Sequence, residues 1–172
     1  MDPAPITDPE RQFLGCLLSL PHAAARTVLT GMRASDVADP ASAHVLQLVI
    51  ETVAEGGDPT PAVVFSHALS TGQAPGEARR SRLALWLAET YEAAHLPAQA
   101  SWLKAAVLER AWRRAVAEHA ERVAQAAEES ATDVLAGITA DTGTAEELWS
   151  RYQHALDGDT RQARRAGLGV AA

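Results

Sequence analysis

The chain has 172 residues, a hydrophobic fraction of 47% and a formal net charge of −7, which allows one domain, or one domain plus an appendage. The acidic balance argues against non-specific binding to DNA phosphates, which needs a clustered positive field. No apolar run reaches the roughly 18 residues of a membrane span, and the N-terminus lacks the features of a secretory signal. Because the single cysteine, Cys16, can form no internal disulfide, we expect a cytoplasmic protein.

The N-terminal part of the chain alternates helix-starting and helix-ending residues, which predicts an all-α fold. An N-cap, a first-turn proline and a capping-box glutamate occupy residues 7–10 and begin a first helix. Its apolar residues recur at the spacing of a buried helix face: Phe13, Leu14, Leu17 and Leu18. Pro21 ends this helix and begins a second, which stops at Gly31.

The pattern of capped helices continues through the next fifty residues or so. Asp39-Pro40 begins a helix that Gly56-Gly57 closes, with a buried stripe of Val45, Leu46, Val49 and Val53. Thr60-Pro61 begins another, which Gly72 stops, with Val64, Phe65, Ala68 and Leu69 predicted to face inward. Residues 73–78 are predicted to form a loop, and the helix that follows carries Leu83, Trp86 and Leu87.

The character of the chain changes after Pro97. Residues 98–129 contain no glycine or proline and are rich in good helix formers. At about 1.5 Å per residue this helix would be on the order of 45 Å long, more than a small domain covers. Residues 130–143 weaken the pattern, a capping box at Thr144 begins a final helix to Leu156, and Gly158 is expected to end it. We therefore predict a compact head at 1–97, a helical hairpin at 98–157 and a disordered tail at 158–172.

Residue patterns that carry chemistry are missing from the sequence. It has no G-x-x-x-x-G-K-(S/T) phosphate loop, no G-x-S-x-G elbow and no Cys-x-x-Cys, and its six histidines are dispersed. We therefore predict no catalytic residue, no cofactor and no metal, and hence no enzyme. Cys16 is interpreted as a small buried apolar residue, and His44 as a helix-start residue that bonds to nearby backbone.

Two groups of residues allow a second interpretation. Two arginine clusters, Arg79-Arg80-Arg82 and Arg110-Arg113-Arg114, could touch nucleic acid, although solvation or ion pairing to neighbouring glutamates fits the acidic background better. Trp102 and Trp112 could form a base-stacking platform, but anchors in a helix–helix interface are the favoured interpretation.

Two motifs resemble a known family. Residues 10–18 read Glu-x-x-x-Leu-Gly-x-Leu-Leu, and Asp39-Pro40 leads through a short spacer to His44 at the start of a later helix. This opening resembles the N-terminal domain of bacterial replicative helicases of the DnaB type. The turn at 55–60, the apolar helix at 83–89 and the long helices at 98–125 and 144–156 follow in the family's order. The resemblance covers about residues 5–157, although Val37 and Ala38 stand where the family usually has aromatic residues.

The resemblance implies a helical head and a hairpin through which two copies pair. An isolated hairpin cannot bury both apolar faces and needs a partner, so a homodimer is the economical arrangement. We expect the interface to contain Trp102, Val116, Val123, Leu148, Trp149 and Tyr152. The implied function is a non-catalytic protein-interaction module of DNA replication that binds a replicative helicase, primase or helicase loader. The alternative is a helical regulatory or DNA-binding protein that shares only the architecture, although no helix-turn-helix with a basic recognition helix is evident.

Overall fold

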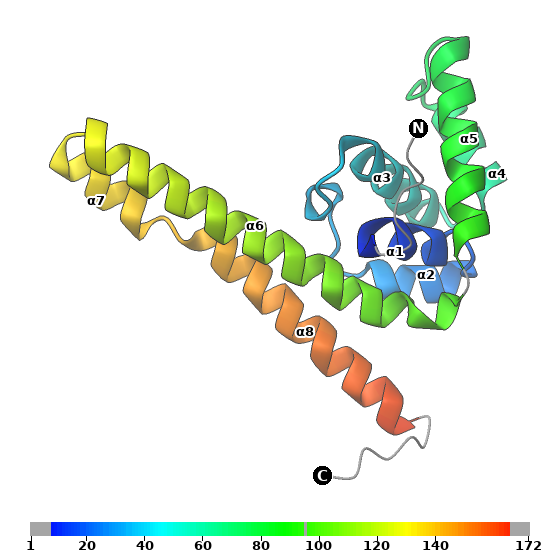
Figure 1. Cartoon of the computed structure of the whole chain (residues 1–172). Coiled ribbons are helices and arrows are strands. Elements are labelled where there is room, and N and C mark those ends of the chain that lie inside the picture. Colours follow the sequence, from blue (N-terminus) through cyan, green and yellow to red (C-terminus); the bar gives the residue numbers. More distant parts are fainter. Residues whose placement is uncertain (1–7, 95, 166–172) are drawn as a thin grey trace. The chain divides into compact units, whose positions relative to one another are not determined.

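The computed structural model describes residues 8–94 and 96–165, with side chains up to residue 158. It divides into two compact units, Met1–Val107 and Leu108–Ala172, so the division falls later in the chain than the head–hairpin boundary expected from the sequence. Helices are the only regular secondary structure in the described part of the chain (Figure 1). The predicted all-α fold is confirmed. No helix among the described residues is long and apolar enough to cross a membrane.

The first unit contains five α-helices, two 3-10 turns and the start of the long helix α6. The α-helices are α1 (Pro9–Leu17), α2 (His22–Leu29), α3 (Pro40–Ala54), α4 (Pro61–Ser70) and α5 (Glu77–Ala93). The short turns η1 (Ala34–Asp36) and η2 (Pro97–Gln99) precede α3 and α6 (Ala100–Glu129). Gly31, Gly56 and Gly72 follow helices with positive φ, as helix-ending glycines do.

Helix α1 is the centre of the first unit's core, where it packs against α3 and α5 (Figure 1). The four predicted inward residues of this helix are fully buried. Its approach to α5 depends on Gly15, because a Cβ atom there would lie 2.5 Å from the carbonyl oxygen of Thr90. Arg11 joins the same two helices, since it donates to Thr90 Oγ1 and to Glu89 Oε2, each at 3.0 Å. The glycine of the E-x-x-x-L-G-x-L-L motif is therefore a close-packing residue.

Glu10 connects the start of α1 to the loop before α3, a role that the sequence did not suggest. The N-cap is Asp8, whose side chain accepts from the backbone N–H of Glu10 at 3.1 Å, while Thr7 lies outside the described residues. Glu10 is 5% exposed, and its carboxylate accepts from the backbone N–H of Ala38 at 2.9 Å. The carboxylate therefore satisfies a buried donor in the loop before α3.

The inward face of α4 differs from the predicted one. Val64 and Ala68 are buried as expected, but Leu69 is 40% exposed, and His67 is buried in its place. The His67 imidazole lies between two carboxylates of the α3 end, 3.0 Å from Glu51 Oε2 and 3.3 Å from Glu55 Oε2. A polar residue occupies the core-facing position because carboxylate partners are available there.

Hydrogen bonds to Glu51 make the head sensitive to acid. Donation from the side chains of Gln47, His67 and Gln73 lowers the pKa of Glu51 from its ordinary 4.5 to about 2. The carboxylate therefore stabilises the folded head fully above pH 4.5, and this contribution disappears as pH falls toward 2.

We expect the difference in melting temperature between the wild type and Glu51→Gln to shrink as pH falls through this window. Thermal unfolding followed by circular dichroism from neutral pH to pH 2 measures it. Glu121→Gln, at an exposed position of α6, is the control for a general loss of charge. A difference that is constant across the window would contradict the role of Glu51.

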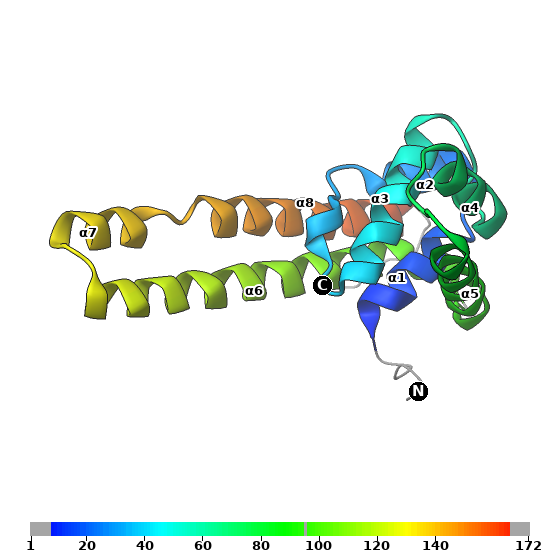
Figure 2. The same cartoon turned by 90° about the horizontal axis from the view of Figure 1, so that it is seen from above.

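The second unit is a helical hairpin (Figure 2). The rest of α6 forms one arm, and α7 (Thr132–Ala140) and α8 (Gly143–Arg165) return antiparallel to it. Helix α7 was not predicted from the weak pattern at 130–143. The expectation that Gly158 ends the last helix is wrong, because α8 continues to Arg165. Gly158 lacks the positive φ of a helix-ending glycine. Of the predicted disordered tail, residues 158–165 are therefore helical, and 166–172 lie outside the described residues.

Candidate interaction surface

An aromatic cluster joins the two arms of the hairpin. The ring centroids of Trp112 on α6 and Trp149 on α8 are 4.8 Å apart with planes tilted by 47°. Tyr152 lies one turn further along α8, with its ring centroid 5.5 Å from that of Trp149. Such tilted aromatic pairs contribute roughly 0.5–1.5 kcal/mol each beyond burial. Trp112 thus packs between two helices, which agrees with the interpretation favoured from the sequence and not with a base-stacking role.

Little else in the hairpin is buried. Among the described side chains from residue 112 onward, only Ala126 and Leu148 are buried. Large apolar side chains remain open to solvent on the same unit: Val116, Val134, Trp149 and Leu156, each 38–49% exposed. These side chains are available for contact with a partner.

The six predicted interface residues fall into different environments. Val116 is 41% exposed and Trp149 is 43% exposed on the hairpin, where Val123 and Tyr152 are partly exposed. Leu148, at 9% exposure, packs within the single chain. Trp102 is 60% exposed and belongs to the first unit.

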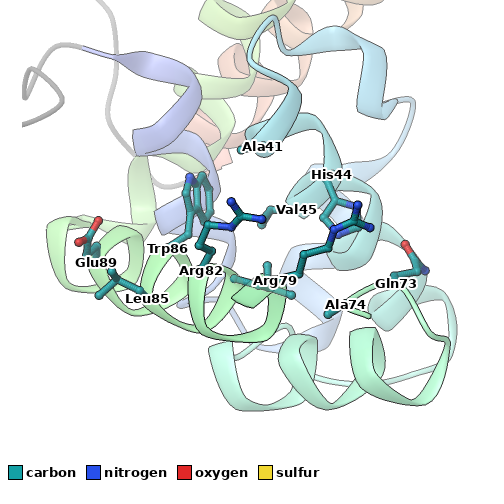
Figure 3. A pocket seen from close by; sticks show the side chains of 11 residues that line it. Ala41, His44, Val45, Gln73, Ala74, Arg79, Arg82, Leu85, Trp86 and Glu89 are labelled. Carbon is teal, nitrogen blue, oxygen red and sulfur yellow. The ribbon is translucent and has the colours of Figure 1, made fainter. Parts of the chain in front are cut away.

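A second candidate surface was not predicted from the sequence. The first unit has an open groove of about 420 Å³, which is lined by residues of α3, of α5 and of the loop before α5 (Figure 3). Val45, Leu83 and Trp86 give it an apolar floor, and Arg79 and Arg82 extend over it from α5 (Figure 3). The only signal in the sequence was the spacing of these α5 residues, which places them on one helix face.

The polar residues at this groove correct the expectation for His44 and narrow the one for the arginines. His44 makes no hydrogen bond to nearby backbone within the described structure, and its ring lies beside the Arg79 side chain instead (Figure 3). Arg80 donates to the carbonyl oxygen of Ala74 at 3.2 Å, whereas Arg79 and Arg82 form no ion pair with any residue in the described part of the chain. Of the two expected environments, solvation and not pairing to glutamates therefore fits Arg79 and Arg82, which are both exposed.

Cys16, the single thiol of the chain, lies in a buried environment that disfavours its reactive form. It is 2% exposed, its Sγ donates to the carbonyl oxygen of Leu96 at 3.3 Å, and burial raises the pKa of the thiol. A raised pKa leaves the thiol protonated at neutral pH, which removes the reactive thiolate. No cluster of three or more metal-ligating side chains occurs within residues 8–94 and 96–158.

Comparison with known proteins identifies the fold. No protein-family model and no curated protein matches the sequence. The structure is similar to the crystal structure of the N-terminal domain of DnaB helicase from Mycobacterium tuberculosis, with a TM-score of 0.62 and 21% sequence identity. The match covers 90% of this chain and 99% of that chain. The chain therefore has the fold of the N-terminal domain of DnaB helicase, as the order of its sequence motifs predicted.

Proposed function

We propose that the chain is a non-catalytic protein-interaction module of DNA replication. In this proposal two copies pair through their hairpins, and the pair docks on a replicative helicase, a primase or a helicase loader. The observation that carries the proposal is the fold: the similarity extends over 99% of a helicase N-terminal domain, so head and hairpin are both represented.

The exposed apolar side chains of the hairpin support self-pairing. A two-helix unit with so few buried residues gains little from its own core, and helices of this kind depend on tertiary or partner packing. Val116 on α6 and Trp149 on α8 remain more than a third exposed. A second hairpin offers matching apolar surface and removes both side chains from water.

The charges of the hairpin argue against nucleic acid as its partner. Arg113 donates to Glu109 Oε1 one turn earlier, at 2.7 Å, and Arg110 and Arg114 also have interaction partners. Phosphate binding needs free cations in a positive field, and the whole chain carries −7. This combination favours the protein-binding function over the alternative of a DNA-binding regulator.

Self-pairing and DNA binding can be tested on the purified chain. Light scattering at micromolar concentration should give the mass of a dimer, and an electrophoretic shift with single- or double-stranded DNA at physiological salt should be weak. The double variant Arg79→Ala/Arg80→Ala should keep the dimer mass, since both residues lie outside the hairpin. A monomer at every concentration would refute the pairing. Tight, salt-sensitive DNA binding that these changes abolish would establish the DNA-binding alternative.

A further inference from the structure

The groove between α3 and α5 combines an apolar floor with charged edges. Val45 and Leu83 are buried beneath it, and Leu85 at its edge is 54% exposed. Its volume of about 420 Å³ lies within the roughly 300–1,000 Å³ that ligand pockets span. The groove is therefore large enough to receive one or two bulky side chains of a binding partner.

The charge at this groove is positive although the chain is acidic. Arg79 and Arg82 point over the floor and have no carboxylate partner among the described residues (Figure 3). Glu89 is the one acidic residue of the lining, and its Oε2 forms an ion pair with Nη2 of Arg11 at 3.0 Å. Two guanidinium groups thus remain available for an anionic ligand, which they can bind by strong, bidentate hydrogen bonds.

We propose that this groove binds an acidic amphipathic helix of a partner protein. Arg79 and Arg82 are three residues apart on α5, or about 4.5 Å along the helix. That separation matches two carboxylates spaced three or four residues apart on a bound helix. An apolar side chain on the same face of the bound helix then fills the floor over Val45, Leu83 and Trp86, as in other helix-in-groove complexes.

The groove suits a peptide better than a nucleic acid. Single-stranded nucleic acids are held by successive aromatic rings on which their bases stack, whereas Trp86 is the one Trp, Tyr or Phe of this lining, and Arg11 lies 5.5 Å from its ring centroid. The remaining floor is aliphatic, which favours leucine-like or aromatic side chains over a polar sugar–phosphate chain. This inference rests on the head alone and does not depend on pairing of the hairpins.

Peptide selection on the full chain tests the proposal. A library of random displayed peptides about four helical turns long is selected against the immobilised protein. Selected peptides should combine two or more acidic residues with an apolar residue one turn away. A synthetic copy should bind the wild type, and its Kd should rise by at least about tenfold in Arg79→Ala/Arg82→Ala and in Leu85→Ser.

Matched variants separate the groove from general charge. Arg26→Ala removes an exposed arginine of α2 and should leave the Kd unchanged. Arg79→Lys/Arg82→Lys should give an intermediate Kd, because lysine keeps the charge but lacks the planar guanidinium group that forms bidentate hydrogen bonds. Circular dichroism checks that each variant is folded. Selection of no acidic peptides, equal binding by the double alanine variant, or preferential binding of a single-stranded oligonucleotide that the same variant loses would each overturn the proposal.

Discussion

Replacing Gly15 with alanine should lower the free energy of unfolding by about 1–3 kcal/mol, the usual cost of overpacking a closed core. The added Cβ would meet the Thr90 carbonyl oxygen at 2.5 Å and the Cβ of Ala94 at 2.7 Å. Contacts this short cannot be kept, so α1 and α5 must separate. The separation weakens the hydrogen bond from Arg11 to Thr90 and loosens the packing of the fully buried Leu14.

Gly137 provides the matched control. It also lies inside a helix, α7, but a Cβ atom added there would have no neighbouring atom within 4 Å. Gly137→Ala should therefore raise stability by about 0.5–1 kcal/mol through the higher helix propensity of alanine. Urea unfolding followed by circular dichroism compares the two variants with the wild type. A neutral or stabilising effect of Gly15→Ala would show that α1 and α5 do not approach so closely.

Val116→Glu should weaken self-association by roughly 1–4 kcal/mol if this side chain sits centrally in the dimer interface. Val116 is 41% exposed in the single chain, so the carboxylate costs little in the monomer. In a dimer it would be buried without a partner, which is expensive. Trp149→Ala should act in the same direction, although it also removes the ring contact with Trp112.

The neighbouring residue offers a control of equal charge. Ala117 is exposed and points away from Val116 on α6, because successive helix residues are about 100° apart. Ala117→Glu should therefore leave the dimer intact. Sedimentation equilibrium over a range of concentrations gives the dissociation constants of the three proteins. Equal weakening by both substitutions would indicate a charge effect and not a specific interface.

Local signals in the sequence were sufficient to predict most helices. The Asp-Pro starts of α1 and α3 are confirmed by side-chain caps, in which Asp8 accepts from Glu10 N and Asp39 from Ser42 N. Continuation of α8 through Gly158 was missed because glycine ends a helix only where its φ turns positive. Helix α7 was missed because none of its residues is buried, so no packing imposes a clear apolar pattern on its sequence.

Features that depend on distant partners could not be predicted. Burial of His67 depends on Glu51, which lies sixteen residues earlier in the chain, and the role of Glu10 depends on the backbone of Ala38. The groove arises only when α1 and α4, which each pack against both α3 and α5, bring these two helices to either side of it, so Val45 and Leu83 looked like ordinary core residues. In contrast, the long helix α6 could be anticipated, because its run without glycine or proline is a local property.

Binding to purified replication proteins is the most direct test of the proposed function. The immobilised chain is exposed to the replicative helicase, primase and helicase loader of the same cell, and in parallel to a single-stranded oligonucleotide, at physiological and raised salt. The proposal predicts saturable binding to at least one of the three proteins and only weak binding to the oligonucleotide. Absence of binding to all three proteins, together with tight oligonucleotide binding that salt abolishes, would contradict it.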